Sequence, residues 1–153
     1  MLKKTFTLLS FLIIFSSSFS QILDPVKWSW ELNQVEGSTY EIVWTADMEP
    51  GWSVYSQYLE SEDGPIATSI TFEKGTHFEL IGLPVEDSLH KEEGFDPIFE
   101  MNLAKYHDQM VIRQKVKILD SEKSIKGMLS FMTCDDEKCL PPKDVDFSIN
   151  ING

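Results

Sequence analysis

The sequence contains few of the residues from which metal centres and cross-linked scaffolds are built. It has only two cysteines and three histidines among 153 residues, which excludes a disulfide-rich scaffold. Basic residues are also scarce, since 13 Lys and Arg stand against 25 Asp and Glu. A chain this acidic is expected to repel nucleic acid and anionic lipid, because binding to phosphates depends on Lys and Arg. Its partners are therefore expected to be proteins, although most of the charge is expected to serve solubility.

The N-terminal stretch "MLKKTFTLLSFLIIFSSSFSQ" has the layout of a secretory signal peptide. Lys3 and Lys4 precede an apolar run, and small residues follow it up to Ser20. We predict a signal peptide over residues 1–20 and one exported domain over residues 21–153, whose formal charge is −14 rather than −12 because two lysines are removed. No later run approaches the roughly 18 apolar residues of a transmembrane helix. We therefore expect a soluble protein of the periplasm or another exported compartment.

Apolar residues recur at every second position in several short runs, as is typical of strands with one buried face. The clearest run is Val145, Phe147, Ile149 and Ile151, and others lie near residues 26–32, 40–44, 70–72, 78–80 and 112–116. Turn sequences such as "MEPGW", "SEDGP" and "EKGTH" separate them. Seven or more short strands at this spacing predict an all-β domain, an antiparallel β-sandwich of immunoglobulin-like type.

The segment from Pro84 to Gln109 does not follow this rhythm. It is charged and irregular, with Gly94 and Pro97 on either side of Phe95 and Asp96. Long loops in compact domains are usually functional or disordered. We predict a long loop here, with one weak helix candidate around "PIFEMNLAKY".

The two cysteines, Cys134 and Cys139, lie in the stretch "FMTCDDEKCLPP". A zinc site would need further ligands, and His77, His90 and His107 have no neighbour at ligand spacing. The sequence also has no nucleophile elbow, zinc-protease helix or phosphate-binding glycine loop. No metal or organic cofactor is therefore expected, and the cysteines are the main candidates for chemistry.

A structural disulfide is the commonest role for two cysteines in an exported protein. A closed loop of about six residues, however, stabilises a fold by only about 2 kcal/mol in the chain-entropy treatment, against about 5 kcal/mol for a loop of about 100 residues. A domain of about 130 residues also buries enough surface to fold without a cross-link. The short loop therefore favours a reactive site, and the structural interpretation stays open.

The disulfide is expected to lie near the surface, at a corner of the sheet. The stretch "KGMLSFMTC" reads as a strand that ends at Cys134, and the last strand begins just after "CLPPKD". Pro141 and Pro142 lack N–H donors, so sheet pairing cannot extend through the connection.

Three acidic residues, Asp135, Asp136 and Glu137, lie between the cysteines, with Lys138 as the only base. Nearby negative charge disfavours the thiolate, the form in which a thiol exchanges, so these acids are expected to raise the cysteine pKa values. We predict a pair that is a poor general nucleophile and that exchanges with a docked partner.

With these features, the sequence resembles the N-terminal periplasmic domains of the thiol:disulfide interchange protein DsbD. The likeness centres on "CDDEKCLPP", while "PGWSVYSQYL" and "EEGFDP" resemble the family's aromatic strand beneath the site and its cap loop. The resemblance implies a redox-active disulfide without cofactor. It also implies that electrons arrive from a membrane electron-transfer protein through a thioredoxin-like domain. They would then pass to periplasmic oxidoreductases that isomerise disulfides or serve cytochrome c maturation.

The resemblance further implies roles for single residues. Cys139 would form the mixed disulfides and Cys134 would resolve them. Phe95 would cover the disulfide as the cap, and Tyr55 would pack near the sulfurs.

Two departures from the family and two other interpretations complete the prediction. Four residues rather than five separate the cysteines, and no membrane or thioredoxin-like domain follows in this sequence. We therefore expect either that separate proteins supply those modules or that the domain serves another use. The competing interpretation is an exported binding or structural module whose disulfide never turns over. A third is metal delivery by the reduced cysteines.

Overall fold

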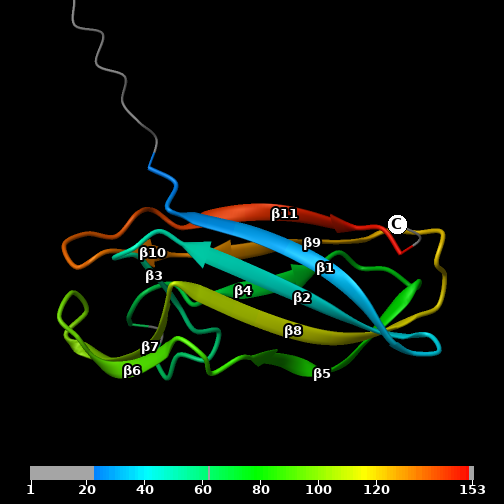
Figure 1. Ribbon diagram of the computed structural model, residues 1–153, viewed down its shortest axis with the longest axis horizontal. Coiled ribbons are helices and arrows are strands. Elements are labelled where there is room, and N and C mark those ends of the chain that lie inside the picture. The colour runs from blue at the N-terminus through cyan, green and yellow to red at the C-terminus, as the bar shows by residue number, and fades with distance from the viewer. Residues whose placement is uncertain (1–22, 62, 152–153) are drawn as a thin grey trace, which may run out of the picture.

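The computed structural model describes residues 23–61 and 63–151, which form eleven β-strands and no helix (Figure 1). This part of the chain accordingly offers no helix long and apolar enough to cross a membrane. The strands pair antiparallel throughout, which confirms the predicted all-β class. The predicted signal peptide, residues 1–20, lies outside the described residues.

Two sheets pack face to face as a sandwich. The main sheet has the order β1 (Val26–Glu36), β2 (Thr39–Met48), β8 (Gln109–Ile118) and β5 (Phe78–Glu86). The opposing sheet has the order β11 (Lys143–Ile149), β9 (Ile125–Phe131) and β4 (Ser69–Phe72). The main core lies between these two sheets, where Trp44 of β2 meets Phe147 of β11 edge to face, with ring centroids 5.5 Å apart.

The alternation seen in the sequence produces this core directly. In β8 every second side chain from Met110 to Ile118 is buried, and Arg113, Lys115 and Lys117 between them are exposed. Burying one face of each strand provides most of the stabilisation of such a sandwich, at roughly 25 cal/mol per Å² of apolar surface.

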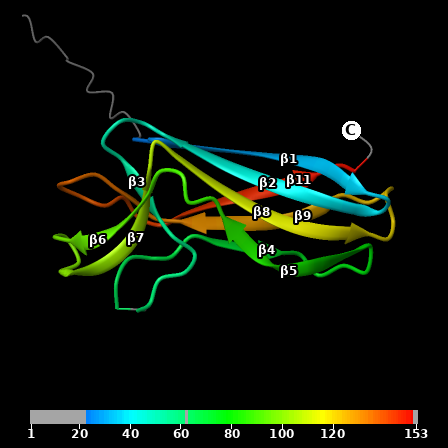
Figure 2. The same cartoon turned by 60° about the horizontal axis from the view of Figure 1, so that its bottom comes forward.

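A third sheet, which we call the end sheet, lies at one end of the sandwich, on the left in Figures 1 and 2. Its order is β10 (Thr133–Cys134), β3 (Ser53–Tyr55), β7 (Met101–His107) and β6 (Lys91–Asp96). It continues the sandwich, because β7 leads into β8 through Asp108 alone and β10 follows β9 after Met132 alone. The framework of the sandwich therefore carries Cys134 to this end of the molecule.

The strands β3 and β7 bury side chains on both faces. Val54 and Tyr106, which lie opposite each other in the pairing, join the main core. Tyr55 and Leu103 join a smaller apolar cluster with Cys134, which we call the disulfide cluster. Partly buried residues complete that cluster: Leu59, Phe99, Met101, Met132 and Cys139.

The segment from Pro84 to Gln109 differs from the predicted long loop. It contains the end of β5, the hairpin of β6 and β7, and the first residue of β8. The helix candidate over residues 97–106 is wrong, because β7 covers most of it. An edge strand exposed on both faces shows no apolar alternation, and four of the six residues of β6 are exposed, so its sequence resembles that of a loop.

Candidate functional site

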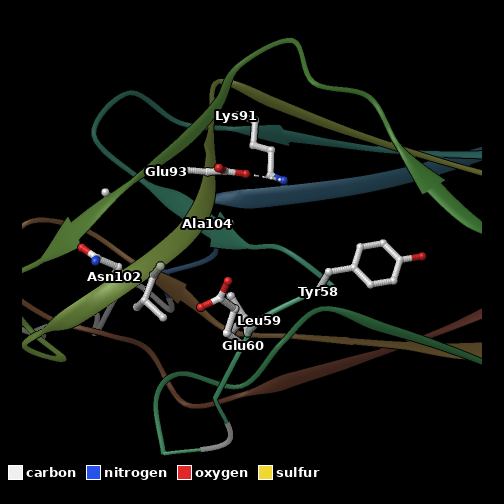
Figure 3. A pocket seen from close by; sticks show the side chains of 9 residues that line it. Tyr58, Leu59, Glu60, Lys91, Glu93, Asn102 and Ala104 are labelled. Carbon is white, nitrogen blue, oxygen red and sulfur yellow. Dashed lines mark ion pairs between the residues drawn. The ribbon is translucent and has the colours of Figure 1, made fainter.

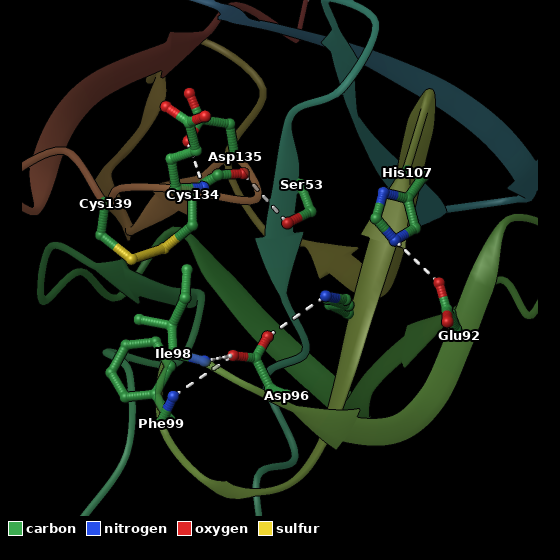
Figure 4. A network of polar contacts seen from close by, with 11 residues as sticks. Ser53, Glu92, Asp96, Ile98, Phe99, His107, Cys134, Asp135 and Cys139 are labelled. Atoms are coloured by element: carbon green, nitrogen blue, oxygen red, sulfur yellow. Dashed lines mark hydrogen bonds and ion pairs between the residues drawn. A yellow bond between two sulfur atoms is a disulfide. The ribbon is translucent and has the colours of Figure 1, made fainter.

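Cys134 and Cys139 form a disulfide at the outer side of the end sheet (Figure 4). Their Cα atoms are 4.0 Å apart, and the two residues also form an isolated antiparallel bridge. Cys134 is only 1% exposed, whereas Cys139 is partly exposed. Cys134 is therefore the inner residue of the disulfide, and Cys139 is the outer one.

The backbone around Cys134 is fixed on both sides. On one side, the Ser53 hydroxyl donates to the Cys134 carbonyl at 3.2 Å, and the Thr133 hydroxyl donates to the Ser53 carbonyl at 2.8 Å. On the other side, the N–H of Leu140 donates to the Thr133 carbonyl at 2.9 Å. Pro141 and the next proline then separate this bridge from β11, as the sequence predicts.

The acidic connection between the cysteines closes on itself. One Asp135 oxygen accepts the N–H groups of Glu137 and Lys138 at 2.9 and 2.8 Å, and the Asp135 N–H donates to the Lys138 carbonyl at 2.9 Å. These hydrogen bonds, first that of Glu137 and then that of Lys138, lower the pKa of Asp135 below its usual value. Asp136 and Glu137 are exposed, so their charges face the solvent from which a partner would approach.

Lys138 is the base of this loop and lies between two neighbours. Its ammonium group is 3.8 Å from an Asp135 carboxylate oxygen and 6.0 Å from the centre of the Trp52 ring. Because Lys138 is paired in this way, it offsets only part of the negative charge beside the disulfide.

A turn at the tip of the β6–β7 hairpin lies against the disulfide. Figure 4 shows Ile98 and Phe99 next to the bond between Cys134 and Cys139. The Phe99 ring packs edge to face on Tyr55, with centroids 5.8 Å apart, and belongs to the disulfide cluster. The structure thus brings Tyr55 and both cysteines together.

Phe95, the predicted cap, lies elsewhere on the hairpin. Its side chain is 66% exposed and is not among the residues of the disulfide cluster. The ring that contacts this cluster belongs to Phe99, four residues further along. The sequence contains both rings in one segment, and only the hairpin geometry distinguishes them.

The turn is held by Asp96, a buried residue that the sequence did not single out. One Asp96 oxygen accepts the N–H groups of Ile98 and Phe99 at 2.9 and 3.3 Å, and the other lies 3.2 Å from the Lys105 ammonium group (Figure 4). Asp96 is 2% exposed. A carboxylate in this position fixes the turn whose Phe99 ring packs in the disulfide cluster.

The Tyr55 hydroxyl is buried between these groups. It lies near the Asp96 carboxylate but has no hydrogen-bond partner of acceptable geometry among the described residues. Burial, and secondarily the negative charge of Asp96, raise the pKa of Tyr55 well above its usual value. Tyr55 is therefore neutral and keeps a proton to donate.

A pocket of about 260 Å³ lies on the other part of the hairpin, between β6, β7 and the segment after β3 (Figure 3). Lys91 and Glu93 line it and form an ion pair at 2.8 Å. No cysteine lines this pocket. Across the described residues, no group of three or more His, Cys, Asp or Glu side chains is placed to hold a metal ion.

Residues 20–150 match the family described as "Thiol:disulfide interchange protein DsbD, N-terminal". No protein with a curated functional description matches the sequence significantly.

Two solved structures share the fold. The N-terminal periplasmic domain of ScsB from Proteus mirabilis has a TM-score of 0.62 and 17% identity, over 85% of this chain and 48% of that one, so this chain spans about half of that structure. The N-terminal domain of DsbD from Neisseria meningitidis, in its reduced form, has a TM-score of 0.52 and 18% identity, over 80% of this chain and 84% of that one. These similarities confirm the predicted immunoglobulin-like fold.

Proposed function

We propose, because the chain belongs to the family of N-terminal domains of the thiol:disulfide interchange protein DsbD, that Cys134 and Cys139 exchange electrons with partner proteins. The observation that carries this proposal is the unequal exposure of the two residues, 1% for Cys134 and partial for Cys139. A mixed disulfide needs one accessible sulfur, and its resolution needs a second sulfur held nearby. The greater exposure of Cys139, and the burial of Cys134 within disulfide distance of it, support these two roles.

The exchange has two steps. In the reduced domain, Cys139 loses its proton and attacks the disulfide of an oxidised partner, so that a Cys139–partner disulfide forms and the second partner sulfur leaves as a thiolate. Cys134, deprotonated in turn, attacks the Cys139 sulfur and displaces the first partner sulfur. Two electrons pass to the partner, its two thiolates take up two protons, and the Cys134–Cys139 disulfide re-forms. The reverse sequence with a reduced donor reloads the domain.

The acidic connection restrains this exchange when no partner is bound. Negative charge from Asp135, Asp136 and Glu137 disfavours a thiolate at either cysteine, and Lys138 is already engaged with Asp135. A docked partner that brings positive charge close to the cysteines would relieve this effect. Exchange would then be faster with the correct partner than with small thiols.

The turn with Ile98 and Phe99 acts as a cover over the disulfide. Its contact with the disulfide cluster supports Phe99 as the capping ring in place of Phe95. Tyr55 would form the floor on which this ring rests. A partner that reaches Cys139 would have to displace the turn, which adds a steric filter to the electrostatic one.

The family also supports a place for the domain in the cell. We assign residues 21–153 to an exported, periplasmic domain released by cleavage of the signal peptide. Thioredoxin-like proteins and a membrane electron-transfer protein would be its donors, and oxidoreductases of disulfide isomerisation or cytochrome c maturation its acceptors.

The test is a pair of single cysteine variants. Cys134→Ser leaves Cys139 without its resolving partner, so mixed disulfides should accumulate in periplasmic extract and disappear on reduction. Cys139→Ser is the matched control and should trap far less, because Cys134 is buried. If Cys134→Ser traps nothing, and the wild-type disulfide has a potential below about −300 mV as inert structural bonds do, the disulfide is structural and the proposal fails.

A further inference from the structure

A pocket of about 270 Å³, which we call the corner pocket, lies between the residues that lead into β1 and the connection from Cys139 to β11. Its lining is largely apolar: Leu23, Val26, Phe131, Leu140, Pro141 and Pro142. Val26 and Phe131 are buried and form its floor, whereas Leu23 is 44% exposed. Neither cysteine lines this pocket, so it is distinct from the disulfide cluster.

The polar side chains that line the corner pocket are already engaged. The Asp24 carboxylate accepts from the ammonium group of Lys143 at 2.7 Å and also from that of Lys27. The Thr133 hydroxyl donates to the Ser53 carbonyl at 2.8 Å. A polar occupant would give up hydrogen bonds to water without finding free side-chain partners here, which is unfavourable. The pocket therefore favours an apolar side chain.

The corner pocket and the disulfide lie on opposite faces of one short ladder. Cys134 is bridged to Cys139, and the N–H of Leu140 donates to the Thr133 carbonyl at 2.9 Å. Both cysteines belong to the disulfide cluster, whereas Thr133 and Leu140 line the pocket, because successive side chains of an extended chain point to opposite faces. β10 is the outermost strand of the end sheet, and the pair of Cys139 and Leu140 lies beyond it.

This arrangement determines what reaches the pocket when Cys139 is bonded to a partner. The Cα atoms of two disulfide-linked cysteines are roughly 4.4–6.8 Å apart, and the next Cα atom of the partner follows after about 3.8 Å. In an extended partner segment beside this edge, the residue next to the cysteine points to the opposite face from the cysteine itself. That opposite face is the one on which Leu140 and the corner pocket lie.

We propose that the corner pocket receives the side chain directly beside the reactive cysteine of a partner protein, and that it selects a large aliphatic one. This inference rests on the proposed exchange through Cys139. The partner is a protein whose reactive cysteine lies in an exposed, extended segment with a leucine-like neighbour. Burial of that neighbour against Leu23 and Leu140 makes the mixed disulfide form faster than with a partner that carries a polar residue there.

The test uses the Cys134→Ser protein and two blocked tripeptides of equal charge, Leu-Cys-Leu and Asn-Cys-Asn, each as its disulfide with 5-thio-2-nitrobenzoate. The Cys139 thiolate attacks the peptide sulfur, the Cys139–peptide disulfide forms, and 5-thio-2-nitrobenzoate leaves as a coloured thiolate whose absorbance gives the rate. The ratio of the Leu-Cys-Leu rate to the Asn-Cys-Asn rate is divided by the same ratio for N-acetylcysteine amide. This corrected ratio should be about five or more, because burial favours an aliphatic group over an amide.

Two variants in the Cys134→Ser background remove the apolar walls separately. Leu140→Ser and Leu23→Ser should each lower the corrected ratio to below about two, and Leu23→Ser keeps the test decisive if Leu140→Ser folds poorly. Leu119→Ser, at an aliphatic residue that is 51% exposed and lies outside the pocket, is the matched control and should keep the ratio. In the Leu-Cys-Leu adduct, amide chemical shifts should change more at residues 26, 140 and 143 than at residues 98–99.

The proposal is overturned by a corrected ratio near one, by a ratio that neither variant lowers, or by shifts centred on residues 98–99. Self-association that Leu23→Ser abolishes would also overturn it, because a second copy of the chain would then occupy the pocket. Equal rates for the two peptides refute only the pocket and leave the redox proposal intact. If neither peptide forms a disulfide with Cys139, both proposals fail.

Discussion

The carboxylate of Asp96 lies 3.2 Å from the ammonium group of Lys105, and Asp96 also holds the turn that we propose as the cover of the disulfide. Asp96 is the last residue of β6 and Lys105 lies on β7, nine positions later in the sequence. Because Asp96 also accepts two N–H groups of the turn, one buried carboxylate joins the turn to Lys105 of β7.

Removal of the Asp96 carboxylate should loosen this cover. Asp96→Ala loses all three hydrogen bonds and should lower the free energy of unfolding by about 2 kcal/mol or more, since hydrogen bonds to charged groups contribute about 1.5–3 kcal/mol. Dithiothreitol should then reduce the disulfide several times faster than in the wild type. Asp96→Asn, which keeps an acceptor for the turn, should show the smaller effect on both urea unfolding and reduction rate. Equal rates in all three proteins would contradict the assignment.

The two phenylalanines of the hairpin should behave differently. Phe99→Ala removes the ring that packs on Tyr55 and should speed reduction by small thiols about tenfold, a change of about 1.4 kcal/mol in barrier. Phe95→Ala removes an exposed ring and should change the rate less than twofold. Stopped-flow measurements with the same thiol compare the reduction rates of the two variants. A larger increase for Phe95→Ala than for Phe99→Ala would identify Phe95 as the cap.

These two phenylalanines also show which features of the site could not be predicted from the sequence. Alternating apolar residues predicted the sandwich, and the short spacing of Cys134 and Cys139 with the following prolines predicted the reactive corner. The hairpin was missed because β7 buries Leu103 on one face and Tyr106 on the other, a spacing of three that imitates a helix. Which phenylalanine contacts the disulfide cluster depends on hairpin register, which local composition does not encode.

Contacts that join distant segments could not be predicted either. Nothing in the sequence around Asp96 indicates that its carboxylate is buried beside Tyr55, 41 positions earlier in the sequence. A signal was available in the Asp-Pro pair at residues 96 and 97, because aspartate commonly accepts N–H groups two and three residues later in turns. The same arrangement recurs at Asp135 in the loop between the cysteines.

Reduction of the disulfide should lower the stability of the fold only slightly. Opening a closed loop of about six residues is expected to lower the free energy of unfolding by about 2 kcal/mol. Urea unfolding with and without reductant measures this difference, and the reduced protein should keep a cooperative transition. A reduced protein that is unfolded in water would instead identify a structural cross-link.

The stability of the loop between the cysteines should depend on pH through the carboxyl group of Asp135. Its folded-state pKa is lowered below 3.8 by the N–H groups of Glu137 and Lys138, so the ionised carboxylate favours the folded loop at pH values above about 4. This contribution is lost as the pH falls through the lowered pKa. Carboxyl carbon NMR should give Asp135 a midpoint below 3.8.

The matched variant for this titration is Asp135→Ala. Between pH 5 and pH 2 it should lose less stability than the wild type, because the acid-sensitive hydrogen bonds are already absent. A wild-type midpoint at or above 3.8 would show that the carboxylate is not engaged by these amides in solution.

The end sheet is continuous with the sandwich, and this continuity bears on how quickly the domain could change its redox state. Because β7 runs into β8 through Asp108 and β9 runs into β10 through Met132, breaking the bond between Cys134 and Cys139 releases only the short connection between them. If the pair turns over as proposed, the domain would pass from one redox state to the other without rebuilding its framework. The number of electron pairs that it delivers each second would then be limited by how often partners arrive and leave.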